Sequence, residues 1–184
     1  MIRSVYFLLI LICPFVALAQ QLSFEEEDIT FEIKDSIFSV DGIYYFNSLS
    51  ENKFSISYPF PKESIYGHPF NIKVIDLASN KNIDYRYNQD TSAVLFQIDV
   101  NGLTPVKISY QQKLKSNRAK YILTTTKHWN TPLKQAGYKL ITDIDFNIIN
   151  FSIRPDKEVI LDGKRIHFWH KVNFFPDTDF KVEF

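Results

Sequence analysis

Length, composition and charge already narrow the functions that this chain can perform. The chain has 184 residues, and its 21 Lys and Arg balance its 21 Asp and Glu, so the formal net charge is zero. A single Cys rules out disulfides within the chain and zinc sites built from several thiolates. The patterns for a phosphate-binding loop, a HExxH zinc site, a GxSxG nucleophile and an EF-hand are all missing from the sequence. We therefore expect no cofactor and no bound metal ion.

The first 19 residues have the three-part pattern of a secretory signal peptide. Arg3 supplies a positive charge, residues 5–18 form an uncharged apolar run, and the small residues before position 20 suit a cleavage site. The run is shorter than the ~20 residues that a membrane-spanning helix needs. We predict cleavage after Ala19, which leaves a single domain over residues 20–184 and no transmembrane segment. The domain is expected to be exported, periplasmic or extracellular, with association with the outer membrane left open.

Cys13 allows an alternative, a lipid-anchored lipoprotein. That processing requires Gly, Ala or Ser immediately before the Cys, and Ile12 occupies this position. Cleavage of a signal peptide would also have a chemical consequence, because Met1 and Cys13 are the only sulfur-containing residues. The mature chain would then have no thiol nucleophile and no redox-active sulfur.

Apolar residues alternate with polar ones through most of the remaining chain. The segments that show this pattern are 29–33, 54–58, 70–74, 94–100, 106–110 and 180–184. Strict alternation is typical of strands with one buried face. Helix signals are scarce, although residues 131–139 could form one helical turn that ends at Gly137. We predict an all-β fold, an antiparallel β-sandwich of immunoglobulin-like or jelly-roll-like type, with about ten strands and little helix. A barrel is the alternative.

Three dipeptides, Asp41-Gly42, Asn101-Gly102 and Asp162-Gly163, are of the type that favours two-residue hairpin turns. The last of these would close a hairpin whose second strand contains RIHFWH, residues 165–170. Its two histidines stand three residues apart, and alternation in a strand sends them to opposite faces. We expect His170 to lie with Phe168 on the core side. His167 and Trp169 would then lie on a mixed outer face, so a metal site made by the two histidines is not expected.

Three groups of carboxylates could carry chemistry. Asp143 and Asp145 would share the outer face of one strand, as a calcium ligand pair or as the two carboxylates of a glycosidase, or simply as a solvated face. Asp177 and Asp179 follow a proline, and we expect them in a turn. The acidic run at residues 25–28 is expected to be a solvated start of the mature chain.

Charge is distributed unevenly along the chain. Between Asp99 and Asp143 there is no acidic residue, while eight Lys and Arg occur there. These cations could pair with the protein's own acidic strands, or they could present a positive surface to lipid headgroups, an acidic glycan or an acidic protein. No nucleic-acid-binding pattern is present, so nucleic acid is not an expected partner. The candidate ligand-binding residues are Lys113, Lys115, Arg118, Lys120, Lys127, His128 and Trp129. Trp129 has a second interpretation, as a plug over the core.

Three longer segments carry a resemblance to a known family. They are DGIYYFNSLSENKFSISYPFP, YILTTTKHWNTPLKQAGYKL and NFFPDTDFKVEF. The chain resembles a family of exported bacterial domains of unknown function. Thr126 stands where that family's pattern has Gly, which leaves the shape of this loop open. The resemblance implies a β-sandwich in the cell envelope and supplies no catalytic residues.

Together these observations favour a non-catalytic exported β-sandwich that binds or scaffolds in the cell envelope through a basic contact surface. One alternative is a carboxylate-dependent glycan hydrolase that uses Asp143 and Asp145. Another is a carbohydrate-binding module that uses exposed Trp129 and Trp169.

Overall fold

The computed structural model describes residues 22–184, so the predicted signal peptide lies outside the described residues. Residues 22–184 form twelve strands and one short 3-10 helix, η1. The longer strands are β1 (Ser23–Lys34), β2 (Ile37–Pro59), β3 (Tyr66–Asp76), β6 (Ala93–Leu114), β8 (Leu133–Asp143) and β11 (Lys164–Phe174). The shorter elements are β4 (Lys81–Asn82), β5 (Tyr85–Tyr87), β7 (Arg118–Tyr121), η1 (Thr124–Trp129), β9 (Asn150–Phe151), β10 (Lys157–Leu161) and β12 (Phe180–Glu183). In this part of the chain no helix has the length and apolar character needed to cross a bilayer.

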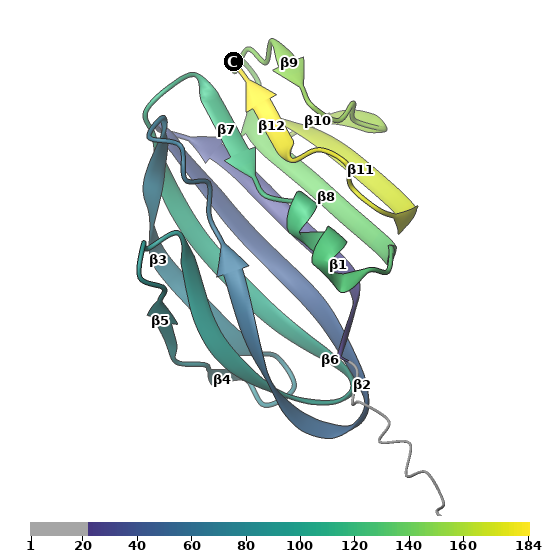
Figure 1. The fold of residues 1–184 in the computed structure, drawn as a ribbon. Coiled ribbons are helices and arrows are strands. Elements are labelled where there is room, and N and C mark those ends of the chain that lie inside the picture. The colour runs from purple at the N-terminus through teal and green to yellow at the C-terminus, as the bar shows by residue number, and fades with distance from the viewer. Residues whose placement is uncertain (1–21) are drawn as a thin grey trace, which may run out of the picture.

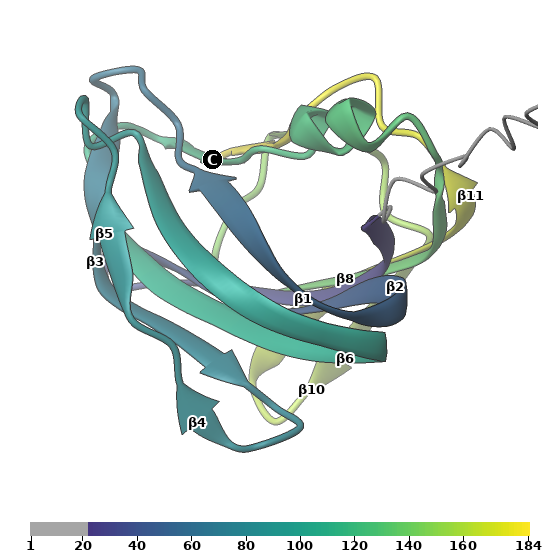
Figure 2. The same ribbon diagram turned by 60° about the horizontal axis from the view of Figure 1, so that its bottom comes forward.

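Two sheets pack face to face, which confirms the predicted β-sandwich (Figure 1). The main sheet has the strand order β10-β11-β8-β1-β2-β6-β3-β4, with β5 paired to β6, and the second sheet has the order β7-β12-β9. Strands β1 and β8 run parallel while their other neighbours are antiparallel, so the main sheet is mixed. Figure 2 shows that the main sheet is strongly curved, with η1 and the end of the chain over its concave side.

The alternation of apolar residues explains how the two sheets are held together. In β1 the predicted inward residues Ile29, Phe31 and Ile33 are buried, with exposures of 0%, 0% and 2%. The Phe31 ring stacks on Phe180 of the second sheet, with ring centroids 4.5 Å apart. Burying one such side chain contributes about 1.5–3 kcal/mol. The contact between Phe31 and Phe180 therefore contributes substantially to the packing of the two sheets.

Only one of the three predicted hairpin turns is present. Asp162-Gly163 joins β10 to β11, with φ values of 50° and 73°. Asp41-Gly42 instead lies inside β2, where a Cβ on Gly42 would come within 2.5 Å of the Tyr44 hydroxyl oxygen. Asn101-Gly102 lies inside β6, opposite a register shift in β2. The glycine of the first pair therefore allows the Tyr44 ring to approach the backbone closely, and the second pair lies at an irregularity in the pairing of β2 with β6.

The helical segment lies earlier in the chain than the sequence predicted. The helical turn predicted over 131–139 is absent, because this segment enters β8, which pairs with β1 along one edge and β11 along the other. Strand β7 ends at Tyr121, and the chain then turns into η1. The Asp179 carboxylate explains this change. It accepts hydrogen bonds from the backbone N–H groups of Leu123 at 3.2 Å and Thr124 at 3.1 Å, which fixes the chain where the helix begins.

Strand β11 alternates as predicted, but the prediction of which face is buried was wrong. His167 and Trp169 are buried, with exposures of 3% and 2%, whereas His170 is exposed. The Trp169 ring lies 5.1 Å from the Phe180 ring, and its Nε1–H donates to the Ile153 carbonyl oxygen at 2.9 Å. The face that carries Trp169 is therefore the one that packs on the second sheet.

Candidate functional site

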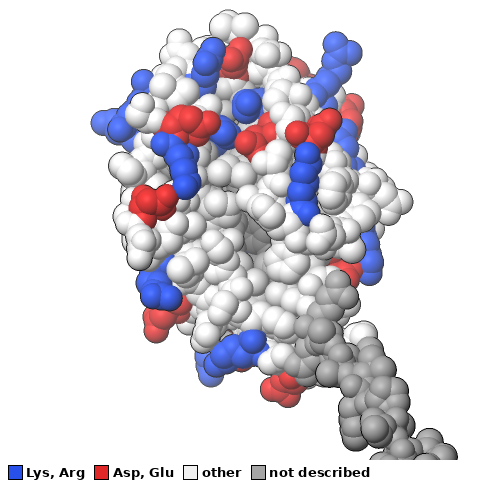
Figure 3. All heavy atoms as spheres, viewed as in Figure 1, with Lys and Arg blue, Asp and Glu red and all other residues white. Residues whose placement is uncertain are grey.

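A cavity of about 480 Å³ lies between the concave face of the main sheet and the segment formed by β7 and η1. Its size falls within the usual range of small-molecule sites. Its apolar and aromatic walls are Phe24, Tyr44, Phe46, Ile56, Tyr58, Pro59, Ile108, Tyr121, Ile122, Leu123 and Trp129. Its other lining residues are Glu27, Ser57, Thr125, Thr126 and His128. Figure 3 shows the molecule from the same side as Figure 1. A hollow near the middle of this view is surrounded mainly by uncharged residues.

The cavity exists because the second layer changes character over this part of the sheet. Over β1 and β11 the covering element is strand β12, whose side chains interdigitate with those of the main sheet. Over the start of β1 and the adjoining Phe46 of β2 it is η1, which carries only one buried residue, Thr126. Trp129 at the end of η1 packs against Phe24 and Phe46, with ring centroids 5.9 and 5.8 Å away. This agrees with the interpretation of Trp129 as a plug, and the indole also forms one wall of the cavity.

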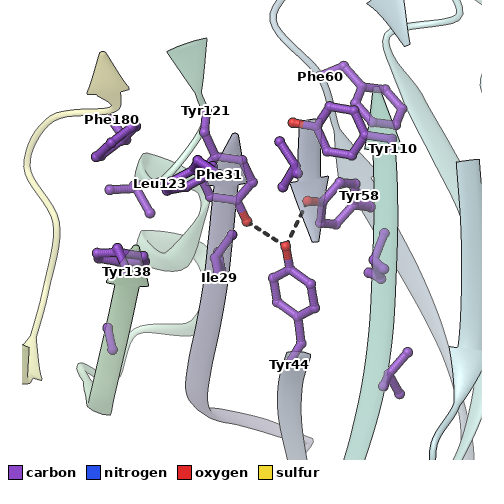
Figure 4. Close-up of a cluster of buried hydrophobic side chains, with 14 of the residues drawn as sticks. Ile29, Phe31, Tyr44, Tyr58, Phe60, Tyr110, Tyr121, Leu123, Tyr138 and Phe180 are labelled. Atoms are coloured by element: carbon purple, nitrogen blue, oxygen red, sulfur yellow. Dashed lines mark hydrogen bonds between the residues drawn. The ribbon is translucent and has the colours of Figure 1, made fainter. Parts of the chain in front are cut away.

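Three tyrosine hydroxyls meet inside the cavity wall. Tyr44 of β2 lies between Tyr58 and Tyr121, with oxygen–oxygen distances of 2.8 and 3.0 Å (Figure 4). Three hydroxyls carry three protons, and two hydrogen bonds use two of them. One O–H group is therefore left to donate elsewhere. Burial raises the pKa of all three tyrosines well above 10.0, so they are neutral and remain donors.

Among residues 22–184, Glu27 is the one carboxylate that lines the cavity. Its side chain is buried, with 4% exposure, and it accepts a hydrogen bond from the Tyr138 hydroxyl. Within residues 22–184 no Lys, Arg or His forms an ion pair with it. Burial raises the pKa of Glu27 from 4.5 to about 7, although the Tyr138 hydrogen bond acts in the opposite direction. Glu27 is therefore close to half ionised at neutral pH.

The expectation that residues 25–28 form a solvated start of the chain was wrong for Glu27. A register shift between Phe24 and Glu26 interrupts the alternation of β1. Both Phe24 and Glu27 consequently point to the cavity, although they are three residues apart. A usable signal was present in the sequence, because Glu27 is in phase with Ile29 and Phe31, whose burial was predicted.

Four of the eight Lys and Arg between Asp99 and Asp143 form ion pairs within the protein. Arg118 pairs with Glu183 at 3.0 Å, and Lys120 pairs with Glu63 at 2.7 Å and with Asp179 at 3.3 Å. Lys107 and Lys134 also pair with acidic residues. Figure 3 accordingly shows blue and red side chains interspersed on this face.

The seven candidate ligand-binding residues have different surroundings. His128 and Trp129 line the cavity. Lys113, Lys115 and Lys127 are exposed and form no ion pair within the described part of the chain. The structure therefore brings two of the seven to the cavity and leaves three as unpaired surface cations.

The residues of the two alternative functions lie elsewhere. Strand β8 ends at Asp143, whose carboxylate is exposed and 2.6 Å from the Lys164 ammonium. Asp145 lies in the following turn, so the two aspartates do not share a strand face, and neither lines the cavity. Trp169 is buried in the core rather than exposed. This removes one of the two indoles that a carbohydrate-binding surface would use.

No family model and no curated protein matches the sequence. Solved structures match its fold. The chain is similar to a candidate nutrient-binding protein from Legionella pneumophila, with a TM-score of 0.66, 11% identity and 89% of this chain covered. It is also similar to an M1 zinc metallopeptidase from Deinococcus radiodurans, with a TM-score of 0.54, 7% identity and 89% of this chain covered. The chain spans 66% of the length of the first and 42% of the second, and at these identities the likeness shows the fold alone.

Proposed function

We propose that the protein is a non-catalytic binding domain that takes a small, largely apolar ligand into the cavity between the main sheet and η1. One observation carries the proposal: a cavity of about 480 Å³ has aromatic walls and only a few polar groups. Such composition is typical of ligand sites, where apolar walls supply affinity and few polar groups fix orientation. A carboxylate hydrolase needs two acids, and Glu27 is the one acid that the described residues contribute to the lining.

The setting of this function is part of the same proposal. The N-terminal sequence supports export and action in the cell envelope. A candidate nutrient-binding protein among the fold neighbours is compatible with ligand uptake by such a domain. The chemistry of the peptidase neighbour is not carried over, because this sequence lacks the HExxH zinc pattern.

A second candidate is contact with an anionic envelope component through the unpaired cations Lys113, Lys115 and Lys127. Their lack of ion pairs within residues 22–184 favours it. Replacing all three by Gln should reduce retention on vesicles that contain phosphatidylglycerol and leave the melting temperature nearly unchanged. Unaltered retention would eliminate this surface.

The cavity proposal can be tested with N-phenyl-1-naphthylamine, an uncharged aromatic dye whose emission rises in apolar surroundings. We expect saturable binding by the wild type. Ile56→Trp fills the cavity wall and should abolish it, whereas Ile160→Trp at an exposed position should not. Unchanged dye binding in Ile56→Trp would contradict the proposal.

A second measurement does not depend on the folding of that variant. Trp129 lines the cavity and Trp169 is buried beside Phe180. Bound dye should therefore shield the remaining indole from a collisional quencher such as acrylamide in Trp169→Phe, and should leave its quenching unchanged in Trp129→Phe. The reverse result would place the dye outside the cavity.

A further inference from the structure

We infer that the cavity selects an organic cation, a ligand with an apolar or aromatic body and one protonated amine whose ammonium group pairs with Glu27. This inference rests on the proposed function, because it assigns the ligand class of the same cavity. It depends on three features of the lining: its charge, its aromatic faces and its hydroxyl groups.

The lining of the cavity carries an acidic group and no Lys or Arg among the described residues. In the part of the chain that the structure describes, Glu27 is its one acid, and none of the sixteen lining residues is Lys or Arg. A buried carboxylate without a counter-charge is costly to ionise, which is why burial raises the pKa of Glu27 to about 7. A bound ammonium group would supply the missing positive charge. An anionic ligand would instead face an unbalanced negative charge inside a low-dielectric cavity.

The walls add a second preference for positive charge. Six of the lining residues are aromatic: Phe24, Tyr44, Phe46, Tyr58, Tyr121 and Trp129. The face of an aromatic ring attracts a cation, and the attraction is stronger where the cation is removed from water. The same rings accommodate an aromatic or branched ligand body. A cation with an apolar tail therefore matches both properties of the wall.

The hydroxyl groups allow the ammonium to be fully satisfied. An alkylammonium group has three N–H donors, and Glu27 accepts at most two of them directly. The phenolic oxygens of Tyr44, Tyr58 and Tyr121 retain acceptor lone pairs after forming their mutual bonds. A primary amine bound beside Glu27 would thus have acceptors from β2 and β7 within one cavity.

Binding of a cation should depend on pH through Glu27. The groups that face Glu27 are Tyr138 of β8, which donates to it, and Tyr44, Tyr58 and Tyr121, whose pKa values its charge raises further. All four are neutral between pH 6 and pH 8. The ionised fraction of a group titrating near pH 7 falls about tenfold between pH 8 and pH 6. Affinity for an amine should fall by about the same factor.

The test uses three compounds with one phenyl body, titrated by calorimetry at pH 8 and pH 6: 2-phenylethylamine, 2-phenylethanol and 3-phenylpropionate. The amine should bind most tightly at pH 8, and its advantage over the alcohol should shrink about tenfold at pH 6. Glu27→Gln keeps the size of the side chain and an acceptor for Tyr138. It should weaken amine binding at pH 8 at least tenfold and change alcohol binding less than about twofold. Repeating the pH comparison in His128→Gln removes the other titratable group at the rim.

The outcomes separate the inference from the function on which it rests. Equal affinity for amine and alcohol, or an amine affinity that neither pH nor Glu27→Gln changes, would overturn cation selection while leaving the cavity a binding site. Binding of the dye without binding of the amine would do the same. Failure of every compound and of the dye would overturn the proposed function as well. The pH comparison in the wild type remains decisive even if Glu27→Gln does not fold.

One further arm distinguishes a free amine from the amino terminus of a peptide. The peptide Phe-Gly-Gly and its N-acetylated form share a body and differ in the ammonium group. Binding of the free peptide at least as tight as that of 2-phenylethylamine would identify a peptide terminus as the source of the cation. Weaker binding would identify a free amine.

Discussion

The two ends of the concave face are built from the same residue types and differ in what covers them. Around Phe31, strand β12 places Phe180 against the sheet, and the space is filled. Around Tyr44, the covering element is η1, and a cavity remains. Aromatic residues form both regions, so composition alone does not distinguish core from site.

The polar atoms show the difference more clearly. The filled end is dominated by carbon, with rings of Phe31, Phe38 and Phe180 stacked on one another. The open end holds a buried carboxyl group and a chain of hydroxyls. Buried polar groups that are only partly satisfied reduce stability and are retained where they serve a ligand. The comparison therefore supports the proposal that a ligand binds at the open end.

The largest expected effect contrasts truncation at the two ends. Phe31→Ala should lower the free energy of unfolding by about 3–5 kcal/mol, because it empties a filled core. Phe46→Ala should cost about 1–2 kcal/mol less, because one side of that ring already borders the cavity and loses fewer contacts. Urea unfolding followed by circular dichroism measures both. Equal losses would indicate that the cavity is closed in solution.

The next effect is a pH dependence confined to the open end. The pKa of Glu27 is about 7 in the folded protein against a usual 4.5, so protonation favours the folded state. Its contribution is fully present below pH 4.5 and is lost as the pH rises through 7. The total is roughly 3 kcal/mol. Between pH 4.5 and pH 8.5 the wild type should lose about this much stability relative to Glu27→Gln. A difference that does not change with pH would refute the assignment.

Alternation in the sequence predicted much of the fold, since strand phase depends on local pattern. It could not decide which face of β11 is buried, because Phe168 on one face and Trp169 on the other are both large and apolar. That choice depends on tertiary packing, because Phe180 of β12 covers the face that carries Trp169. The turn at Asn101-Gly102 failed for a related reason. Gly102 has the positive φ of 63° that such a turn favours. The chain does not reverse there, because β6 pairs with β2 on both sides of Gly102.

The site was harder to predict than the fold. Tyr44, Tyr58 and Tyr121 come from distant positions, and only the curvature of the sheet brings their hydroxyls together. Glu27 was within reach of sequence reasoning, because it continues the inward phase of β1. A run of acidic residues suggests exposure to solvent, and the prediction followed this composition rather than the alternation that places Glu27 inward. A charged residue at an inward-facing position of a strand is therefore easily predicted to be exposed, because its residue type suggests solvent while its position suggests burial.

The smallest expected effect concerns the hydroxyl chain itself. Tyr44→Phe removes both hydrogen bonds of the chain, so it should cost about 1–2 kcal/mol. Tyr58→Phe removes one bond, keeps the pair between Tyr44 and Tyr121, and should cost about 1 kcal/mol. Tyr45→Phe, on the opposite face of β2, is the matched control and should be nearly neutral. If Tyr44→Phe is also neutral, water inside the cavity satisfies these hydroxyls, and the tyrosines serve the ligand rather than the fold.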